Sequence, residues 1–363
     1  GSVDLDTFYL SGALEGQVYD GPWSDIDEDV EKLNGLLKLG GDDDVSTWST
    51  TVMYYQNDWN SADQIPERAV SMGLIDEFGS IDDTLGGDTR RASLSGQYTH
   101  QHEEHRSEWQ AYVIDYELNL WSNFTYLLED PVAGDQFKQE DGRTVYGGRY
   151  NRFWVGGIDE HFHNSLGVEL RYDDIDTVGL YRTEARQHLD TVREDSAEQA
   201  SVGLFYELAW RFTADWRAVL GIRGDYYWFD VEAQESVNSG DDADTIISPK
   251  ASLIYAFSET TEAYLSGGYG FHSNDARGVT ITVDPVTGQP TSSVDPLVQS
   301  KGAELGFKTV WLDTWNTSLA LWYLELDSEL LFVGDAGTTE ASRPSERWGV
   351  EFNNFWALDD IFS

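Results

Sequence analysis

Apolar and polar residues alternate along Ser201–Phe212, "SVGLFYELAWRF", and this period of two limits the fold more than any other feature of the chain. Every even position in the stretch is aliphatic or aromatic, whereas the odd positions include Gly203, Glu207 and Arg211. Because successive side chains of a β-strand point to opposite faces, the pattern predicts a strand with one apolar and one largely polar face. The apolar face then contacts either a protein core or lipid.

The same alternation recurs in about fourteen segments from one end of the chain to the other. They are Phe8–Tyr19, Val30–Leu39, Val45–Asn57, Arg91–Gln101, Trp109–Phe124, Thr144–Gly157, Ser165–Asp173, Ser201–Phe212, Asp215–Val231, Pro249–Phe257, Thr261–His272, Lys301–Trp311, Trp315–Leu326 and Arg347–Trp356. Short connections (41–44, 102–107, 159–163, 213–215, 258–260, 313–314) alternate with long ones (58–90, 127–143, 174–198, 232–248, 273–300, 327–346). This rhythm predicts an all-β, antiparallel transmembrane β-barrel with short periplasmic turns and long extracellular loops.

Charge and composition exclude several classes of function. The net charge is −43, and so acidic a surface repels nucleic acid, so no nucleic-acid partner is predicted. The chain has no cysteine, which excludes disulfides, thiolate metal sites and cysteine nucleophiles. No run of about 18 apolar residues is present, so no transmembrane helix is predicted, although strands of about ten residues can still cross a membrane.

The sequence has none of the common motifs of catalytic or cofactor sites. It lacks GxSxG, a P-loop, HExxH and a GxGxxG that follows a strand. His100, His102 and His105 lie across a predicted short turn, without the three or four converging ligands that a metal centre needs. We therefore predict no enzyme activity, no cofactor and no metal site.

Aromatic residues lie near the ends of the apolar strand faces. In Asp215–Val231 this face has Trp216 and Trp228 near its ends and Leu220 and Ile222 between them. Aromatic belts around an aliphatic band are typical of the two interfaces of a membrane. The apolar faces are therefore predicted to contact lipid and the polar faces to line a lumen. A soluble β-protein with amphipathic strands is the alternative.

This assignment gives each face a set of residues. The predicted lipid-facing residues are Leu204, Tyr206, Leu208, Trp210, Leu220, Ile222, Trp228, Trp322 and Leu324. The predicted lumen-facing residues are Glu207, Arg211, Arg217, Arg223, Asp225 and Glu325. The same reasoning identifies Tyr112, Ile114, Tyr116, Leu118 and Leu120 as the apolar, lipid-facing side of another strand.

Several blocks resemble the barrel of TonB-dependent outer-membrane receptors. The most specific are "GFHSNDARG" (Gly270–Gly278), "VDPLVQSKGAELGFK" (Val294–Lys308) and "LALWYLELDSELLFVGDAGTTEASRPSERWGVE" (Leu319–Glu351). The resemblance implies about 22 strands, a size at which the lumen is plugged. The plug, its energy-coupling box and the last strands have no counterpart in the sequence. Residues 1–363 are therefore predicted to be a partial barrel without a plug domain.

The resemblance also implies a function. Such receptors reside in the outer membrane of Gram-negative bacteria and import scarce nutrients, a metal–siderophore complex being the expected cargo. Their partners are the TonB energy-transducing complex, which acts through the plug, and membrane lipid and lipopolysaccharide. The alternatives are a passive porin-like barrel and a soluble acidic β-sheet protein.

Two groups of residues are candidates for binding the cargo. His272, Asn274, Asp275 and Arg277 lie where a strand meets a long loop, and together they offer hydrogen-bond donors and acceptors. Arg182 and Arg186 lie in the predicted loop 174–198, and the planar guanidinium fork of arginine suits an anionic chelate. The alternatives are loop architecture for the first group and internal ion pairing for the second.

Overall fold

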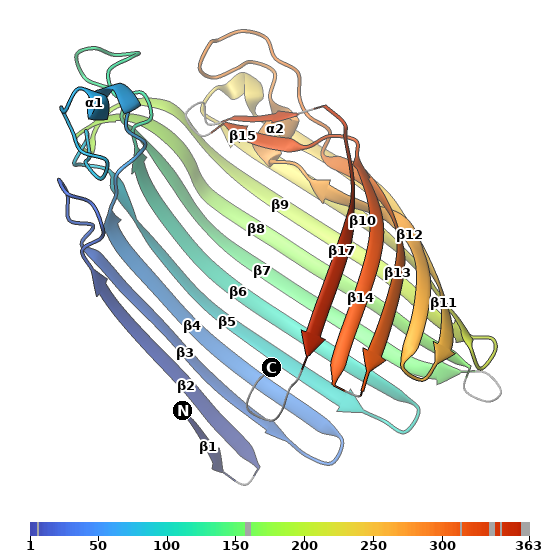
Figure 1. The fold of residues 1–363 in the computed structure, drawn as a ribbon. Helices are drawn as coiled ribbons and strands as arrows, with labels where there is room; N and C mark the ends of the chain where they lie inside the picture. Colours follow the sequence, from blue (N-terminus) through green and yellow to red (C-terminus); the bar gives the residue numbers. More distant parts are fainter. Residues whose placement is uncertain (6, 157–160, 313, 334–337, 342, 357–363) are drawn as a thin grey trace.

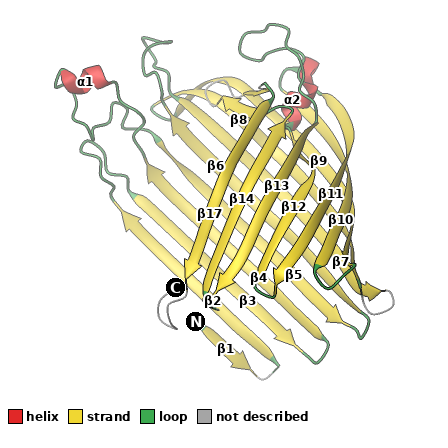
Figure 2. Ribbon diagram, turned by 45° about the vertical axis from the view of Figure 1, so that its right-hand side comes forward, coloured by secondary structure: helices red, strands yellow, loops and turns green. Residues whose placement is uncertain are grey.

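One curved antiparallel sheet of 15 strands makes up most of the molecule (Figure 1). The computed structural model describes residues 1–363 apart from 6, 157–160, 313, 334–337, 342 and 357–363. The strands follow one another in sequence order from β1 to β14, and β17 is the last neighbour of β14. Figure 2 shows β12, β13, β14 and β17 in front of the first strands, so the sheet curls round on itself.

The bounds of the elements are as follows. The main sheet contains β1 (Ser2–Leu5), β2 (Phe8–Tyr19), β3 (Val30–Asp42), β4 (Ser46–Asn60), β5 (Gly86–Gln101), β6 (His105–Ser122), β7 (Phe137–Gly156), β8 (Phe162–Glu184), β9 (Gln187–Arg211), β10 (Trp216–Ala233), β11 (Gly240–Ser258), β12 (Thr261–Ser273), β13 (Leu297–Trp311), β14 (Trp315–Leu326) and β17 (Ser345–Trp356). The remaining elements are α1 (Glu67–Ser71), η2 (Ser236–Asn238), α2 (Ala276–Thr280) and the hairpin β15 (Leu330–Val333) and β16 (Thr338–Ala341). In the described residues, no helix is both long and apolar enough to cross a membrane.

The predicted all-β, antiparallel organisation is confirmed. Each predicted segment overlaps one strand of the sheet, whereas β1 and the hairpin β15–β16 were not predicted. The helices α1 and α2 and the hairpin β15–β16 lie at one end of the sheet, and tight turns lie at the other (Figure 1). We call these the loop end and the turn end. Parts of the predicted turns 159–163 and 313–314, residue Gly157 and residues 357–363 lie outside the described residues.

The predicted long loop 174–198 is wrong. These residues extend β8 and β9, which pair as far as a two-residue turn at Ala185 and Arg186. Both turn residues have positive φ, 47° and 64°, as a type I′ hairpin turn requires. The pairing contains three register shifts. Each bulge inserts a residue and resets the side-chain alternation, so the period of two disappears from the sequence while the strands continue.

Cross-strand partners show which residues share a face of the sheet. Leu208 lies opposite Leu220, and Tyr206 lies opposite Ile222. On the other face, Arg211 lies opposite Arg217. The unbroken register of β9 and β10 therefore puts Leu204, Tyr206, Leu208, Trp210, Leu220, Ile222 and Trp228 on one face, and Glu207, Arg211, Arg217, Arg223 and Asp225 on the other.

The charged face is the concave one. Ser273–Arg277, which begins at the last residue of β12, lines a cavity together with Leu118 of β6 and Arg143 of β7. These strands are far apart in sheet order, so they can meet only across the inside of the curve. Arg223 of β10 belongs to the same face, because it pairs with Glu169 of β8 at 2.6 Å, and Glu169 pairs in turn with a β7 arginine. Contact of the convex face with lipid stays a prediction.

Three of the predicted orientations are wrong. In β14, Leu321 pairs with Leu305, and the register then leads through β12 and β11 to Ala218 on the convex face. Trp322 and Leu324 alternate with Leu321 and are therefore concave, whereas Glu325 is convex and pairs with Lys301 at 2.7 Å. Both phases of "LALWYLEL" are apolar, so the alternation could not distinguish them. Trp322 fills the space above Gly349 of β17.

The predicted orientation of β6 is also wrong. Tyr112 lies over Gly147 of β7, where a Cβ atom would clash with the tyrosine ring, and Leu118 lines the concave cavity. The convex phase carries Glu117, which pairs with Arg90 of β5 at 2.6 Å. The strand extends to the loop end, where the convex face is charged. The rule that the apolar residues of a strand face outward therefore does not hold along the whole of β6.

The corrected register of β14 predicts that arginine is destabilising at one of two adjacent positions and tolerated at the other. Leu321→Arg places a charge on the convex face and should cost about 2–4 kcal/mol if that position lies near the middle of the membrane. Ala320→Arg lies on the concave face, opposite Glu351, and should be tolerated. Urea unfolding of the full-length protein in lipid vesicles measures both changes. A larger loss from Ala320→Arg would contradict the assigned faces.

Candidate ligand site

Arginine–carboxylate pairs two residues apart recur on the concave face. Arg223 binds Asp225 at 2.7 Å, and Arg171 binds Asp173 at 2.6 Å. Residues i and i+2 of a strand point to the same face, so the long arginine side chain reaches the shorter carboxylate along the strand. A Cβ atom at Gly203 would clash with the Arg223 guanidinium, so this glycine lets Arg223 cross β9. Each of these arginines is therefore paired with a carboxylate of its own strand.

A buried network of two such pairs joins α2 to the concave wall. Asp275 accepts a hydrogen bond from the backbone N–H of Arg277 at 2.9 Å, and the Arg277 guanidinium binds its carboxylate at 2.7 Å. Arg193 and Asp195 of β9 form the second pair. Ala276 packs into a hydrophobic cluster with Ile175, Ala197, Phe229 and Val231, on β8, β9 and β10. Segment 273–280 is thereby fixed against the inside of the sheet.

The ionisation of Asp275 depends on this network. Burial raises its pKa, but the charge of Arg277 and the hydrogen bonds from Arg277 lower it by more, so the net pKa lies below the usual value. For Arg277, burial lowers the pKa, but the charge of Asp275, the hydrogen bonds to its carboxylate and the charges of Asp195 and Asp141 together outweigh burial, so the net pKa is raised. Both groups are therefore charged at neutral pH, and each depends on the other.

A cavity of about 470 Å³ lies between this segment and the strands β6–β9. Of the predicted cargo-binding residues, Asn274, Asp275 and Arg277 line it. Asn274 is 4% exposed, and its Nδ2 donates to the Asp295 carbonyl at 2.5 Å. Its Oδ1 has no hydrogen-bond partner among the described residues. His272 does not line the cavity, and its buried Nε2 also lacks a partner in the described structure.

The cavity also contains residues that were not predicted. Asp141 and Arg143 of β7 line it, and they bind each other with an Nε–Oδ1 distance of 2.6 Å. They fall in the predicted long loop 127–143, whereas β7 already begins at Phe137. The sequence signal that could have found this pair is an aspartate and an arginine two residues apart, in Asp141–Arg143. Other ion pairs on the wall have the same spacing.

Arg182 and Arg186 do not line the cavity. Arg182 binds Asp130 at 2.8 Å. Arg186 donates from Nε to the Thr84 carbonyl at 2.6 Å and from Nη2 to the Leu85 carbonyl at 2.8 Å. The structure therefore gives both arginines internal partners, and Arg186 ties the tip of the β8–β9 hairpin to the loop 61–85.

Polar side chains around Arg186 join three loop-end segments. The Gln136 Oε1 accepts from the Arg186 backbone N–H and from the Thr183 hydroxyl, both at 2.8 Å. Its Nε2 donates to Asp82 at 3.0 Å, and Asn123 donates to the same carboxylate at 3.0 Å. Burial raises the pKa of Asp82, but these hydrogen bonds and those from Thr84 outweigh it, so the net pKa is lowered. We call Asp82, Asn123, Gln136, Thr183 and Arg186 the loop junction.

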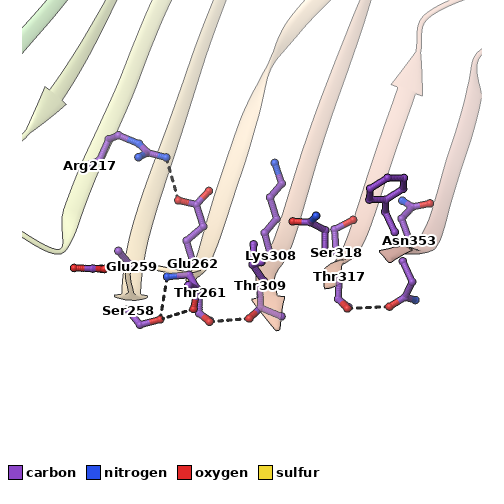
Figure 3. Close-up of a pocket in the computed structure, with 16 residues that line it drawn as sticks. Arg217, Ser258, Glu259, Thr261, Glu262, Lys308, Thr309, Thr317, Ser318 and Asn353 are labelled. Carbon is purple, nitrogen blue, oxygen red and sulfur yellow. Dashed lines mark hydrogen bonds and ion pairs between the residues drawn. The ribbon is translucent and has the colours of Figure 1, made fainter. Parts of the chain in front are cut away.

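A second cavity, of about 610 Å³, lies at the turn end (Figure 3). Figure 3 shows Arg217 reaching toward Glu262, with an N–O distance of 3.2 Å. Thr261 and Thr309 share a hydrogen bond at 2.8 Å between β12 and β13. Most of its lining residues carry hydroxyl, amide or charged groups, among them Lys308 and Asn353.

Comparison with known proteins gives a family and a set of similar folds. The family model described as TonB dependent receptor-like, beta-barrel matches residues 23–363. The ferric citrate transporter FecA, in its unliganded form, has a TM-score of 0.74 and 13% identity, covering 97% of this chain and 51% of FecA. The copper transporter OprC has a TM-score of 0.72 and 15% identity, covering 99% of this chain and 57% of OprC.

The ferric yersiniabactin uptake receptor FyuA from Yersinia pestis is similar to the same extent. Its TM-score is 0.72 at 13% identity, covering 99% of this chain and 56% of FyuA. At such identities the similarity shows a shared fold. The chain spans 51–57% of the length of these three solved structures. No curated protein sequence matches it.

The loop junction predicts different effects for two arginines of one hairpin. Arg186→Ala removes hydrogen bonds from a charged donor. The free energy needed to open the loop 61–85 should therefore fall by about 1.5–3 kcal/mol. Arg182→Ala removes one exposed ion pair and should change opening by about 0–1 kcal/mol. Hydrogen exchange of backbone amides in 61–85 measures both. Equal exchange in the two variants would show that Arg186 does not anchor the loop.

The lowered pKa of Asp275 predicts an acid-sensitive segment. A carboxyl group whose folded pKa lies below its unfolded value of 3.8 stabilises the fold above that pH and loses its contribution as pH falls through the folded pKa. Protection of amides in 274–296 from hydrogen exchange, corrected for intrinsic rates, should therefore stay constant from neutral pH to about 4 and fall below it. Asp275→Asn should lower protection throughout and remove the acid step. An unchanged acid step in this variant would exclude Asp275 as its cause.

Proposed function

Because the chain belongs to the TonB-dependent receptor β-barrel family, we propose that it forms part of the barrel of an energy-coupled importer. Proteins of this family lie in the outer membrane of Gram-negative bacteria, and so does this chain. The family consists of receptors and transporters rather than enzymes. The proposed work is binding and passage of a nutrient, without covalent chemistry.

The proposed cargo is a scarce nutrient such as a metal–siderophore complex. Two similar folds are named for ferric chelates, FecA and FyuA, and a third, OprC, for copper. The observation that carries the proposal is the cavity of about 470 Å³ at the loop end of the concave wall. It lies where a cargo from outside the cell would first meet the inside of the barrel. Ligand sites of this size, with a few polar groups in fixed positions, are typical of small-molecule recognition.

The proposed partners follow from the two faces and the two ends. Lipid would cover the convex residues such as Leu204 and Leu220, and lipopolysaccharide would contact the loop-end half of the outer wall. TonB would act through a plug domain inside the barrel. The cavity at the turn end, with Arg217, Glu262 and Lys308 in its wall, would offer such a domain hydrogen-bonding groups.

Energy coupling separates this proposal from a passive barrel. Cells that produce the full-length protein should accumulate radioactive iron from a ferric chelate, and a protonophore or deletion of tonB should abolish the accumulation. Surface binding at low temperature should persist in both cases, because binding precedes the energy-dependent step. Accumulation that continues without TonB would favour the porin-like alternative. Recovery of the protein in buffer without detergent would favour the soluble one.

A further inference from the structure

Arg91 of β5 differs from most arginines of the concave face, because it has no carboxylate partner. The arginines of this face that bind a carboxylate include Arg143, Arg149, Arg171, Arg193, Arg223 and Arg277. Arg91 lies directly opposite Tyr116, which alternates with Leu118 along β6 and is therefore concave. Arg91 is exposed and forms no ion pair with any described residue. It therefore offers an unpaired guanidinium group to the inside of the sheet.

The neighbours of Arg91 on this face carry no carboxylate. Tyr55 of β4 and Tyr116 of β6 lie directly opposite it. Residues two positions further along the three strands also share the face. They are Met53, Asn57, Thr89, Ser93, Ile114 and Leu118. None of these side chains can neutralise a guanidinium group, so Arg91 gives this patch a positive charge.

The next residue along the strand shows the height at which Arg91 lies. Arg90 pairs with Glu117 at 2.6 Å and with Asp115 at 3.5 Å. Successive residues of a strand point to opposite faces, so these three charged groups are convex. Charge on the outer face of a barrel is unfavourable in hydrocarbon, which places this level of the proposed barrel above the lipid. Arg91 then lies in the loop-end part of the lumen, which a molecule from outside the cell reaches first.

Arg91 also borders the loop-end cavity of about 470 Å³. Leu118, which lines the cavity, lies directly opposite Thr89, two residues from Arg91 on the same face. Arg143, another lining residue, lies directly opposite Tyr116. The arginines in the lining itself are held by aspartates. The guanidinium group available to a molecule in the cavity is therefore the one beside it.

We propose that Arg91 binds a negatively charged oxygen group of the cargo, such as a carboxylate, and that Tyr55 and Tyr116 donate hydrogen bonds to the same group. The planar guanidinium fork matches a carboxylate, and neither tyrosine hydroxyl has a hydrogen-bond partner among the described residues. The inference rests on the proposed function and adds a substrate class to it. It transfers the anion-binding role expected of Arg182 and Arg186 to an arginine without an internal partner.

The test compares two chelates that differ in one carboxylate. A linear ferric trihydroxamate with a terminal amine becomes neutral when the amine is acetylated and carries one negative charge when the amine is succinylated. Quenching of tryptophan fluorescence in the purified full-length protein measures the affinity for each. The carboxylate form should bind about ten-fold more tightly at low salt, because hydrogen bonds between charged groups are stronger than neutral ones. The preference should fall as salt screens the exposed guanidinium group.

Three variants locate the effect. Arg91→Gln removes the charge from the concave face, so the preference for the carboxylate form should disappear. Arg90→Gln makes the same change one residue away on the convex face and should leave the preference unchanged. Arg91→Lys keeps the charge without the planar fork and should retain part of the preference. Because Arg91 is exposed and unpaired, its substitutions should leave the protein folded. Equal loss of the preference in Arg91→Gln and Arg90→Gln would overturn the assignment to the concave face.

The outcomes separate this inference from the function on which it rests. Equal binding of the two chelates, binding of neither, or a preference that survives in Arg91→Gln would each overturn the inference. Iron accumulation that depends on TonB tests the importer proposal separately, and that proposal stands wherever such accumulation persists.

A carboxylate of a plug domain is the other source of an anion for Arg91. In that case Arg91→Gln should weaken the protection of plug amides from hydrogen exchange in the ligand-free protein. The affinities for the two chelates should then be the same as in the unchanged protein. This combination would exclude the cargo as the partner of Arg91.

Discussion

The register between neighbouring strands is the constraint on which the rest of the structure depends. From β9 to β14, each strand pairs with the next without a shift in its central part. A slip of one residue anywhere would turn a whole strand over. It would put Arg223 among leucines and Leu220 among carboxylates. The charged pairs of the concave wall and the apolar convex surface are thus two results of one alignment.

The sequence allowed most of this organisation to be predicted, because a period of two is visible wherever only one face is apolar. Ser201–Phe212 and Asp215–Val231 are such stretches, and their residues share faces as expected. Trp322 and Leu324 were misplaced because both phases of β14 are apolar. The extension of β8 and β9 was missed because its bulges interrupt the alternation. Local pattern therefore predicts a strand well and predicts its orientation only when the two faces differ in polarity.

The ligand site was harder to predict, for a physical reason. His272, Asn274, Asp275 and Arg277 are neighbours in sequence and could be selected together. Asp141 and Arg143, which line the same cavity as Asn274, Asp275 and Arg277, come from a strand far away in the chain. Only the curvature of the sheet brings these groups together, and curvature has no short sequence signal. The role of Arg186 was unpredictable for the same reason, because its acceptors are backbone carbonyls of a distant loop.

The β8–β9 hairpin is an anchored element at the loop end of the molecule. Its ladder of backbone hydrogen bonds continues to the Ala185–Arg186 tip, and the tip is fastened to the loop 61–85. An epitope tag inserted at the tip would therefore loosen two loops at once. The turn at Asp284–Gly288 is closed by local hydrogen bonds, from the Val286 and Thr287 N–H groups to the Asp284 carboxylate and between backbone groups of the turn, and residues 286–293 are exposed. A peptide inserted into this exposed turn should therefore disturb the fold less than one inserted at the β8–β9 tip.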